Sequence, residues 1–215
     1  MSLTLIGKKR GMTRIFDEKS GHVIPCTVIE LDSNVVSQIK TLEKDGYQAV
    51  QMSAVKPTAS QKKNMTKPLT GHYSKKSIEP RVVARESRID DVSGMELGKE
   101  FNSDYFEVGS YVDVQGQSKG KGYQGVMKRF GASGMNKSHG QGPVQRHLGS
   151  SGSLTSHGRV QKNKKMAGQM GNAKVGIQSL LVVKVNAEQK ALVVKGAVPG
   201  ANGGTVFIRK AIKKA

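Results

Sequence analysis

The chain has two kinds of segment. Short apolar runs lie toward both ends, and the long stretch between them has few apolar residues. The runs are short, several alternate apolar and polar positions, and turn residues separate them, which favours strands over helices. The expected strands cover residues 3–16, 23–31, 35–39, 47–55, 81–88, 108–115, 175–185, 191–198 and 205–208. This pattern predicts a mainly β fold whose body is a small antiparallel β-barrel.

Glycines and turn residues refine the expected strands. Gly7 and Gly11 are expected to break the first strand, and residues 17–21 to form a turn. Residues 32–34, Asp-Ser-Asn, predict a strand, tight turn, strand unit. Residues 108–115 alternate with a period of two, which predicts a strand. The candidates for its inner face are Val108, Tyr111 and Val114.

Residues 56–80 interrupt the strand pattern, within a side insertion expected at about residues 56–100. Three prolines, Pro57, Pro68 and Pro80, punctuate a stretch rich in Lys, Ser and Thr. Proline and low apolar content predict an irregular side insertion on the surface, with at most a short helix around residues 71–77.

Residues 116–174 cannot form a core of their own. The acid-free run around them, residues 114–187, is 74 residues long and carries twelve Lys or Arg. The Leu, Ile, Val or Phe side chains of residues 131–174 are Val144, Leu148, Leu154 and Val160. Ordering about 44 residues costs roughly 1 to 2 kcal/mol each in backbone entropy, which four side chains at about 1.5 to 3 kcal/mol do not offset. The stretch is therefore disordered alone or ordered by a polyanionic partner.

Charge and position separate this stretch from the rest of the chain. The 215 residues carry a net charge of +19, but the 141 residues outside 114–187 carry only +7. Because strands are expected on both sides, the stretch is an insertion in one sheet system and not a tail. We therefore expect a β body at residues 1–115 and 175–215 and an extended basic loop at residues 116–174.

A glycine motif and three histidines suggest other chemistry only superficially. Residues 120–125 match G-x-G-x-x-G before an expected helix at 126–130, but a dinucleotide site needs an acid about twenty residues later, and none occurs before Glu188. His139, His147 and His157 have no acidic or Cys companions and lack metal-ligand spacing. No catalytic residue, metal or cofactor is therefore expected.

Cysteine and targeting features point to a reducing compartment. Cys26 is the only cysteine, in an apolar run, and is expected to be buried and inert. Residues 1–6 are too short for a signal peptide, and no run of eighteen apolar residues exists. The prediction is a cytosolic protein with no membrane segment.

The placement of aromatic residues favours one mode of nucleic-acid binding. Modules that read single-stranded bases stack them on Phe or Tyr, yet no aromatic side chain of this kind occurs between Phe130 and Phe207. The basic stretch is therefore expected to contact the backbone and shape of folded RNA, with its glycines letting main-chain N–H groups approach phosphates.

A series of motifs resembles one protein family from end to end. The motifs are GKKRGMT at 7–13, IPCTVIE at 24–30, DGY at 45–47, KGKGYQGV at 119–126, KKMAGQMG at 164–171 and KGAVPG at 195–200. Together they resemble the third large-subunit ribosomal protein family, the universal ribosomal protein L3 family, in its bacterial form.

The resemblance implies a structural constituent of the large ribosomal subunit, cytoplasmic and not an enzyme. It implies a β-barrel seated on large-subunit (23S-type) rRNA beside neighbouring ribosomal proteins, a role in early assembly, and a loop directed toward the peptidyl transferase centre. The alternative is an RNA chaperone or nucleoid-type protein outside the ribosome. The expected RNA contacts are Lys8, Lys9, Arg10, Lys119, Lys121, Lys128, Arg129, Lys137, His139, Arg146, Ser150, Arg159, Lys162, Lys164, Lys165 and Lys174.

Two parts of the stretch depend on details of the resemblance. The family usually has a His-Arg pair where this chain has Gln145-Arg146, and a Gly where it has Asn163, so the path of the loop tip is open. Gln169, in a Gly-Gln dipeptide, corresponds to a glutamine that some members carry as N5-methylglutamine. The resemblance therefore makes a glutamine methyltransferase a candidate partner, and an unmodified Gln169 bonded to RNA is the alternative.

Overall fold

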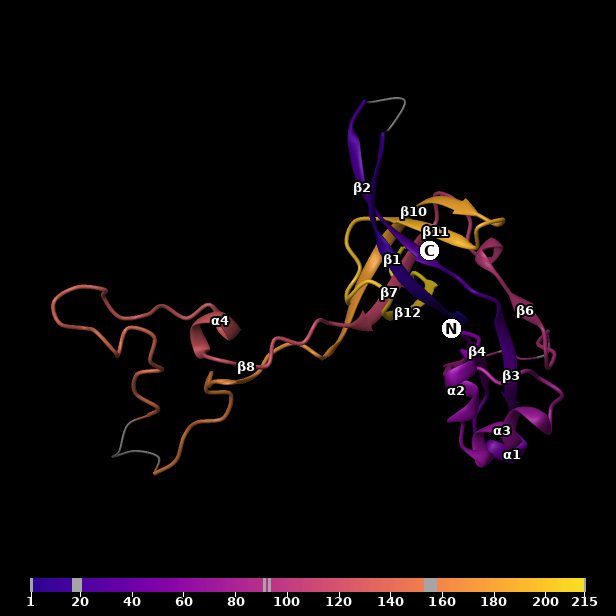
Figure 1. Cartoon of the computed structure of the whole chain (residues 1–215), viewed down its shortest axis with the longest axis horizontal. Coiled ribbons are helices and arrows are strands. Elements are labelled where there is room, and N and C mark those ends of the chain that lie inside the picture. Colours follow the sequence, from indigo (N-terminus) through magenta and orange to yellow (C-terminus); the bar gives the residue numbers. More distant parts are fainter. Residues whose placement is uncertain (1, 17–20, 91, 93, 153–157, 215) are drawn as a thin grey trace. The chain divides into compact units, whose positions relative to one another are not determined.

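The chain divides into two units (Figure 1). The computed structural model describes residues 2–16, 21–90, 92, 94–152 and 158–214. The first unit, here the β unit, is Met1–Gln117 with Lys174–Ala215, and the second, here the basic unit, is Ser118–Ala173. Among the described residues, strands hold 38% and helices 12%, which confirms a mainly β protein.

Six antiparallel strands of the β unit pair in a closed ring. They are β1 (Thr4–Phe16), β2 (Val23–Glu30), β7 (Tyr111–Gln117), β10 (Lys174–Asn186), β11 (Ala191–Lys195) and β12 (Thr205–Lys210). Around the ring the order is β1-β12-β7-β10-β11-β2, and β2 pairs again with β1. The first strand therefore pairs with the last, with Thr4 opposite Arg209. The predicted hairpin at the C-terminal end is confirmed, since β10 pairs with β11.

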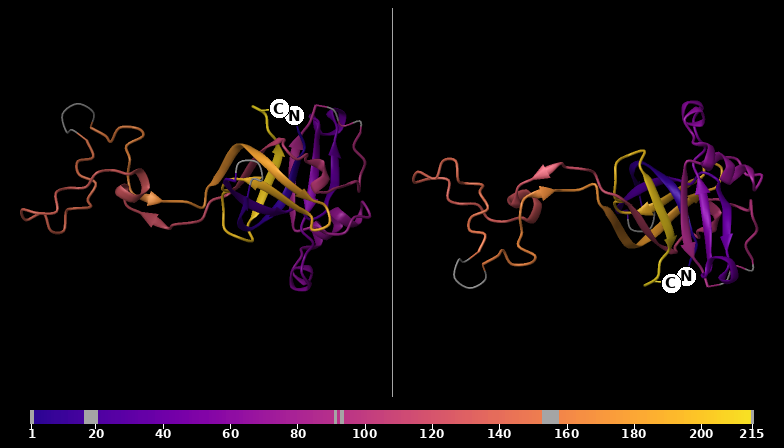
Figure 2. Two further views of the ribbon diagram at one scale, coloured as in Figure 1. Left: turned by 90° about the horizontal axis from the view of Figure 1, so that it is seen from above. Right: turned by 90° about the horizontal axis from the view of Figure 1, so that it is seen from below.

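A four-stranded sheet completes the β unit (Figure 2). Its strands are β3 (Asn34–Lys40), β4 (Ala49–Ala54), β5 (Val83–Arg88) and β6 (Glu100–Phe101), in the order β5-β4-β3-β6. The short helices of this unit are α1 (Leu42–Asp45), α2 (Ala59–Lys63), α3 (Lys67–Ser74) and the 3-10 turn η1 (Ser103–Tyr105). Two helices thus occupy the stretch for which one, at residues 71–77, was expected. Thr58 begins α2 with a reciprocal capping box to Gln61. A capping box is a local signal for a helix start and does not depend on apolar content.

One apolar cluster joins the ring and the second sheet. Leu5 and Ile29 of the ring and Val50 and Met52 of the second sheet are all fully buried in it. Cys26 is also fully buried, as predicted, and its burial raises the pKa of the thiol. The β unit is therefore held by ordinary close packing of aliphatic side chains.

Gly7 does not break the first strand, contrary to expectation. β1 runs without interruption through Gly7, and its register shifts only between Lys9 and Gly11. A side chain at Gly7 would lie within 2.8 Å of Ile29 Cγ2 and 2.9 Å of the Glu30 carbonyl oxygen. This glycine permits close packing of β1 against β2 instead of ending the strand.

The expected strand, tight turn, strand unit at residues 23–39 forms both strands but no pairing between them. β2 pairs with β1 and β11, whereas β3 pairs with β4 and β6. Buried Asn34 explains the departure, because its Oδ1 accepts from Ile6 N at 2.8 Å and its Nδ2 donates to Ile6 O at 3.0 Å. The Asn34 side-chain amide therefore bonds to the backbone of β1 as a residue of a neighbouring strand would. At Asn34 the chain passes from the ring to the second sheet.

The inner face of β7 also differs from the expectation. Val112 and Val114 are fully buried, Tyr111 is half-buried and Val108 is 64% exposed. Val108 precedes the strand, which begins only at Tyr111, and Val112, Asp113 and Val114 are buried in succession, so burial along β7 does not follow the expected alternation. The turn expected at residues 17–21 lies mostly outside the described residues.

Candidate nucleic-acid interface

Main-chain hydrogen bonds hold together the two ends of the basic unit. Ser118 N donates to Ala173 O at 2.8 Å, and Lys121 N donates to Met170 O at 2.9 Å. Just beyond them, β8 (Tyr123–Gln124) pairs with β9 (Gly168–Gln169). Gly171, with φ +71°, lies so close to the Lys119 carbonyl oxygen that no side chain fits there. The sequence therefore builds a narrow two-stranded base at the ends of this unit.

Helix α4 (Val126–Phe130), at the position that the sequence predicted, packs against this base. Arg129 donates from Nη1 to Met166 O at 2.8 Å and lies over the Phe130 ring, 4.9 Å from its centre. Lys165 Nζ lies 6.0 Å from the same ring centre. Arg129 is half-buried by these contacts, so part of its guanidinium supports the unit itself.

The rest of the basic unit has neither helices nor strands in its described part. Between Gly131 and Met166, none of the described residues is buried, and Val144, Leu148 and Val160 are each about 40% exposed. A few main-chain bonds give local order, such as Met135 N to Gln145 O at 3.0 Å. The sparse apolar content that the sequence shows thus corresponds to an unpacked surface.

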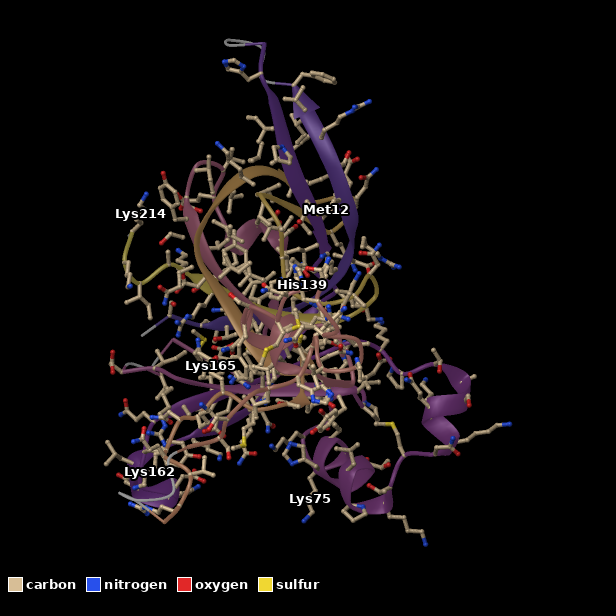
Figure 3. The ribbon with its side chains drawn as sticks, turned by 90° about the vertical axis from the view of Figure 1, so that its left-hand side faces the viewer. Met12, Lys75, His139, Lys162, Lys165 and Lys214 are labelled. Atoms are coloured by element: carbon tan, nitrogen blue, oxygen red, sulfur yellow. The ribbon has the colours of Figure 1, made fainter. Side chains whose placement is uncertain are left out.

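The predicted contacts within this unit are exposed, apart from Arg129. Lys162 and Lys165 are labelled in Figure 3. The exposed set is Lys119, Lys121, Lys128, Lys137, His139, Arg146, Ser150, Arg159, Lys162, Lys164 and Lys165. Residues 118–173 contain no Asp or Glu, so no carboxylate of this unit neutralises these cations. The unit therefore presents positive charge without internal compensation, which suits a polyanion.

The three basic residues at positions 8–10 of β1, the N-terminal triplet, differ in their exposure. Lys9 is only 8% exposed, and its Nζ donates to Val198 O at 2.7 Å and to Gly200 O at 3.4 Å. The ammonium group of Lys9 is therefore held inside the β unit, which does not favour the predicted contact of Lys9 with RNA. Lys8 is half-buried and Arg10 is exposed.

Arg10 already has an acidic partner. Its Nη2 lies 2.8 Å from Glu30 Oε2, and the hydrogen bond to Glu30 raises the pKa of the guanidinium. An RNA phosphate at Arg10 would compete with that carboxylate. Lys174, the remaining predicted contact of the β unit, is exposed at the start of β10.

The departures from the family pattern can be placed on the structure. Arg146 is exposed, and the neighbouring Gln145 accepts the Met135 N–H through its carbonyl. Asn163 has φ +63°, in the left-handed region that glycine favours. Asparagine is among the few other residues that tolerate this conformation. Asn163, in place of the family's usual Gly, therefore still allows this backbone conformation.

Gln169 lies exposed on β9, opposite Tyr123 of β8. Its side-chain Nε2 donates to the carbonyl oxygen of the next residue, Met170, at 3.2 Å. Tyr123 is 76% exposed and was not among the predicted contacts. The sequence does contain a signal for an RNA contact at this position, because Tyr123 is an aromatic residue among the lysines and glycines of residues 119–125.

Other chemistry finds little support in this region. The G-x-G-x-x-G motif at residues 120–125 contains the two-residue strand β8 and precedes the five-residue helix α4. Strand β8 pairs antiparallel with β9, which is not the βαβ unit of a dinucleotide site. Among the described residues no group of His, Cys, Asp and Glu could hold a metal ion, and His157 lies outside them. None of the helices in the described part has the length and apolar character to cross a bilayer.

Fold and surface together define a mainly β protein that carries an exposed, acid-free cationic unit suited to a polyanion. Residues 88–191 match the family model described as "Ribosomal protein L3". "Large ribosomal subunit protein uL3" of Nocardia farcinica (strain IFM 10152) is 48% identical over 211 residues, covering 97% of this chain and 93% of that protein. The protein of the same name from Francisella tularensis subsp. novicida (strain U112) is 46% identical over 213 residues, covering 99% and 100%. The chain belongs to the ribosomal protein L3 family.

Proposed function

We propose that the protein is a structural constituent of the large ribosomal subunit and binds large-subunit (23S-type) rRNA. The observation that carries this proposal is the near full-length similarity to relatives named as large ribosomal subunit proteins. The exposed cations of the basic unit supply the chemistry, because Lys and Arg that neutralise phosphates release counterions and give sequence-independent affinity. Its place in the cell is the ribosome.

The two units take different parts in this proposal. Residues 1–115 and 175–215 form the small β-barrel body, which is seated on rRNA beside neighbouring ribosomal proteins. Residues 56–100, expected as an irregular insertion, contribute helices α2 and α3 and strand β5 to this body. Residues 116–174 form a basic loop that penetrates the rRNA, acts during early assembly and is directed toward the peptidyl transferase centre. The proposed role is structural and not enzymatic.

Two features favour the backbone of folded RNA as the ligand of this loop. Its exposed groups are cations, short polar side chains and glycine N–H groups, which bind phosphate and sugar oxygens. None of the described residues between Gly131 and Met166 is buried, so packing within the unit does not stabilise their conformation. RNA contacts would therefore stabilise the conformation that packing does not.

Association with ribosomal subunits tests the proposal. The full chain should sediment with large subunits in low salt and remain with them after a high-salt wash, because rRNA encloses the loop. The isolated chain should bind rRNA with strong salt dependence, weakening by around 10³ to 10⁵ between 50 and 200 mM salt if roughly six to ten phosphates are contacted. Complete release from subunits by the wash would instead indicate an RNA chaperone or nucleoid-type protein.

Crosslinking and mass spectrometry test the detailed contacts. Crosslinks from the lysines of residues 119–174 should map to one contiguous region of large-subunit rRNA. We also propose Gln169 as a substrate of a glutamine methyltransferase, since its side chain is exposed beside Gly168. A peptide containing Gln169 from native ribosomes should carry the added mass of one methyl group, and an unmodified peptide would remove this part of the proposal.

A further inference from the structure

A polar hollow in the β unit has no role in the binding described so far. Its volume is about 170 Å³, and strands β5, β7, β10 and β12 all contribute to its lining. The side chains that matter are Arg85, Asp113, Gln115, Gln178, Phe207 and Arg209. Drug-sized ligands usually occupy roughly 300 to 1,000 Å³, so this hollow suits a smaller group.

A flat cationic surface forms one wall. The Arg85 guanidinium carbon lies 4.9 Å from the centre of the Phe207 ring, and Arg85 Nη2 lies 3.4 Å from Gln115 Oε1. Nucleobases stack on aromatic rings and on guanidinium planes alike. The wall therefore offers a stacking surface of the kind that residues 131–173 lack.

A fixed carboxylate also lines the hollow. Asp113 is 7% exposed, and its Oδ1 accepts from Ser179 N at 3.0 Å while its Oδ2 lies 3.4 Å from Arg209 Nη2. Ser179 has φ +56° where the register of β10 shifts between Ile177 and Leu180. This bulge turns the Ser179 N–H out of the ladder and toward Asp113, which holds the carboxylate in place.

Hydrogen-bonding capacity remains unused around this carboxylate. The Gln178 side chain is exposed and bonds to no group in the described part of the chain. Gln115 uses Oε1 for the 3.4 Å contact, which leaves the donors of its Nε2 available there. Two amides and a carboxylate together offer donors and acceptors at one edge of a planar ligand, whereas a bare anion would meet Asp113 as a like charge.

We infer that this hollow binds a single unstacked nucleotide of RNA. The base stacks on the Arg85–Phe207 pair, its edge bonds to Gln115, Gln178 and Asp113, and its phosphate lies toward Arg209. The inference rests on the proposed function and adds a base-contacting site on the β unit to the backbone contacts of the basic unit.

The test is a titration of ¹⁵N-labelled full chain with guanosine monophosphate in low salt. Guanine is the chosen base because its N–H donors suit the carboxylate and its O6 suits an amide or guanidinium donor. The side-chain NH₂ signals of Gln115 and Gln178 should shift and saturate. Ribose 5-phosphate and inorganic phosphate lack the base. Their affinity for these residues should be lower by roughly tenfold or more.

Matched variants locate the binding. Arg85→Gln and Gln178→Ala should each weaken the nucleotide by roughly five- to tenfold, because each removes a stacking or hydrogen-bonding partner. The controls Arg88→Gln, on the same strand as Arg85, and Gln189→Ala, an exposed glutamine outside the hollow, should bind as the parent does. Thermal unfolding of every variant checks that the fold is retained, and the exposed Gln178 keeps the test informative if Arg85→Gln unfolds.

Equal binding of ribose 5-phosphate and the nucleotide, or unchanged affinity in both hollow variants, would overturn the inference. Sedimentation of the same variants with large subunits separates it from the proposed function. Absent nucleotide binding with intact sedimentation removes the site alone, whereas failure of the parent chain to sediment removes the ribosomal role.

Discussion

The β unit and the basic unit use the same chain in opposite ways. Among the described residues, the β unit contains all but one of the buried aliphatic side chains, and Val126 is the only buried residue of the basic unit. Every Asp and Glu of the sequence also lies in the β unit. One unit is stabilised by its own packing, and the other has surface and charge in place of a core. The difference shows that a segment whose partner supplies the stabilising contacts can omit the apolar residues that independent folding requires.

Removal of residues 118–173 is the largest test of this contrast. Gln117 and Lys174 are opposite each other on β7 and β10, so a short glycine linker can join them. The shortened protein should unfold cooperatively, as followed by circular dichroism, but should lose roughly 10³-fold or more of its rRNA affinity in low salt. Unchanged affinity, measured by fluorescence anisotropy, would place the binding energy in the β unit.

Paired truncations of aliphatic side chains compare the two units by stability. Ile29→Ala removes a fully buried side chain and should lower the free energy of unfolding by about 2 to 5 kcal/mol. Leu148→Ala, at a position that is 40% exposed, should change it by less than about 0.5 kcal/mol. Urea denaturation measures both, and a large effect at Leu148 would reveal packing in the basic unit that the structure does not show.

Charge removal compares the units by salt dependence. Replacing Lys162, Lys164 and Lys165 by Gln should reduce the slope of log affinity against log salt by about one per lysine. The matched control replaces three exposed lysines of the β unit, Lys62, Lys63 and Lys75, and should change the slope by less than one in total. Equal losses in the two triple variants would remove the distinction between the units.

Lys8 and Lys9 allow the same comparison between adjacent residues. Lys9→Met leaves Val198 O without its donor and should cost about 1 to 3 kcal/mol of stability, with rRNA affinity nearly unchanged. Lys8→Met should leave stability within about 0.5 kcal/mol and weaken rRNA binding. Denaturation and anisotropy on both proteins check the assignment, which fails if Lys9→Met lowers affinity without loss of stability.

An ion pair in the second sheet predicts the smallest effect. A hydrogen bond from Lys40, with Nζ 2.8 Å from Glu86 Oε2, lowers the pKa of Glu86 in the folded state. Its contribution is therefore present above the unfolded pKa and is lost as pH falls through the folded value. Because both side chains are partly exposed, Glu86→Gln should remove well under 1 kcal/mol at neutral pH, and less in acid. Unfolding curves of both proteins across acidic pH measure this difference.

Strand positions could be predicted from the sequence, but strand partners could not. Alternation reports that one face of a run is buried, and β4, β11 and β12 lie where it indicated. It does not report which strand lies alongside, and for β2 and β3 that choice depends on Asn34, whose amide bonds to the distant backbone of Ile6. A buried asparagine in a turn-like tripeptide resembles any exposed one in sequence.

The exposure of the basic unit was more predictable than that of the N-terminal triplet. Residues 118–173 have no acid and few apolar groups, so no folding of this segment alone can hide or neutralise its charge. In the triplet, burial depends on a β-strand, on its register shift after Lys9, and on the carbonyl groups of residues 198 and 200. These contacts join distant parts of the chain and leave no local pattern.

The pairing of Thr4 with Arg209 also sets an order of events during synthesis. The ring cannot close until β12 has been made, so β1 waits with one edge unpaired while the whole basic unit is translated. Contacts between residues so far apart in sequence form slowly, and an unpaired strand edge is prone to wrong association. The nascent protein therefore has a long interval in which early capture by RNA, or protection by a chaperone, governs its yield.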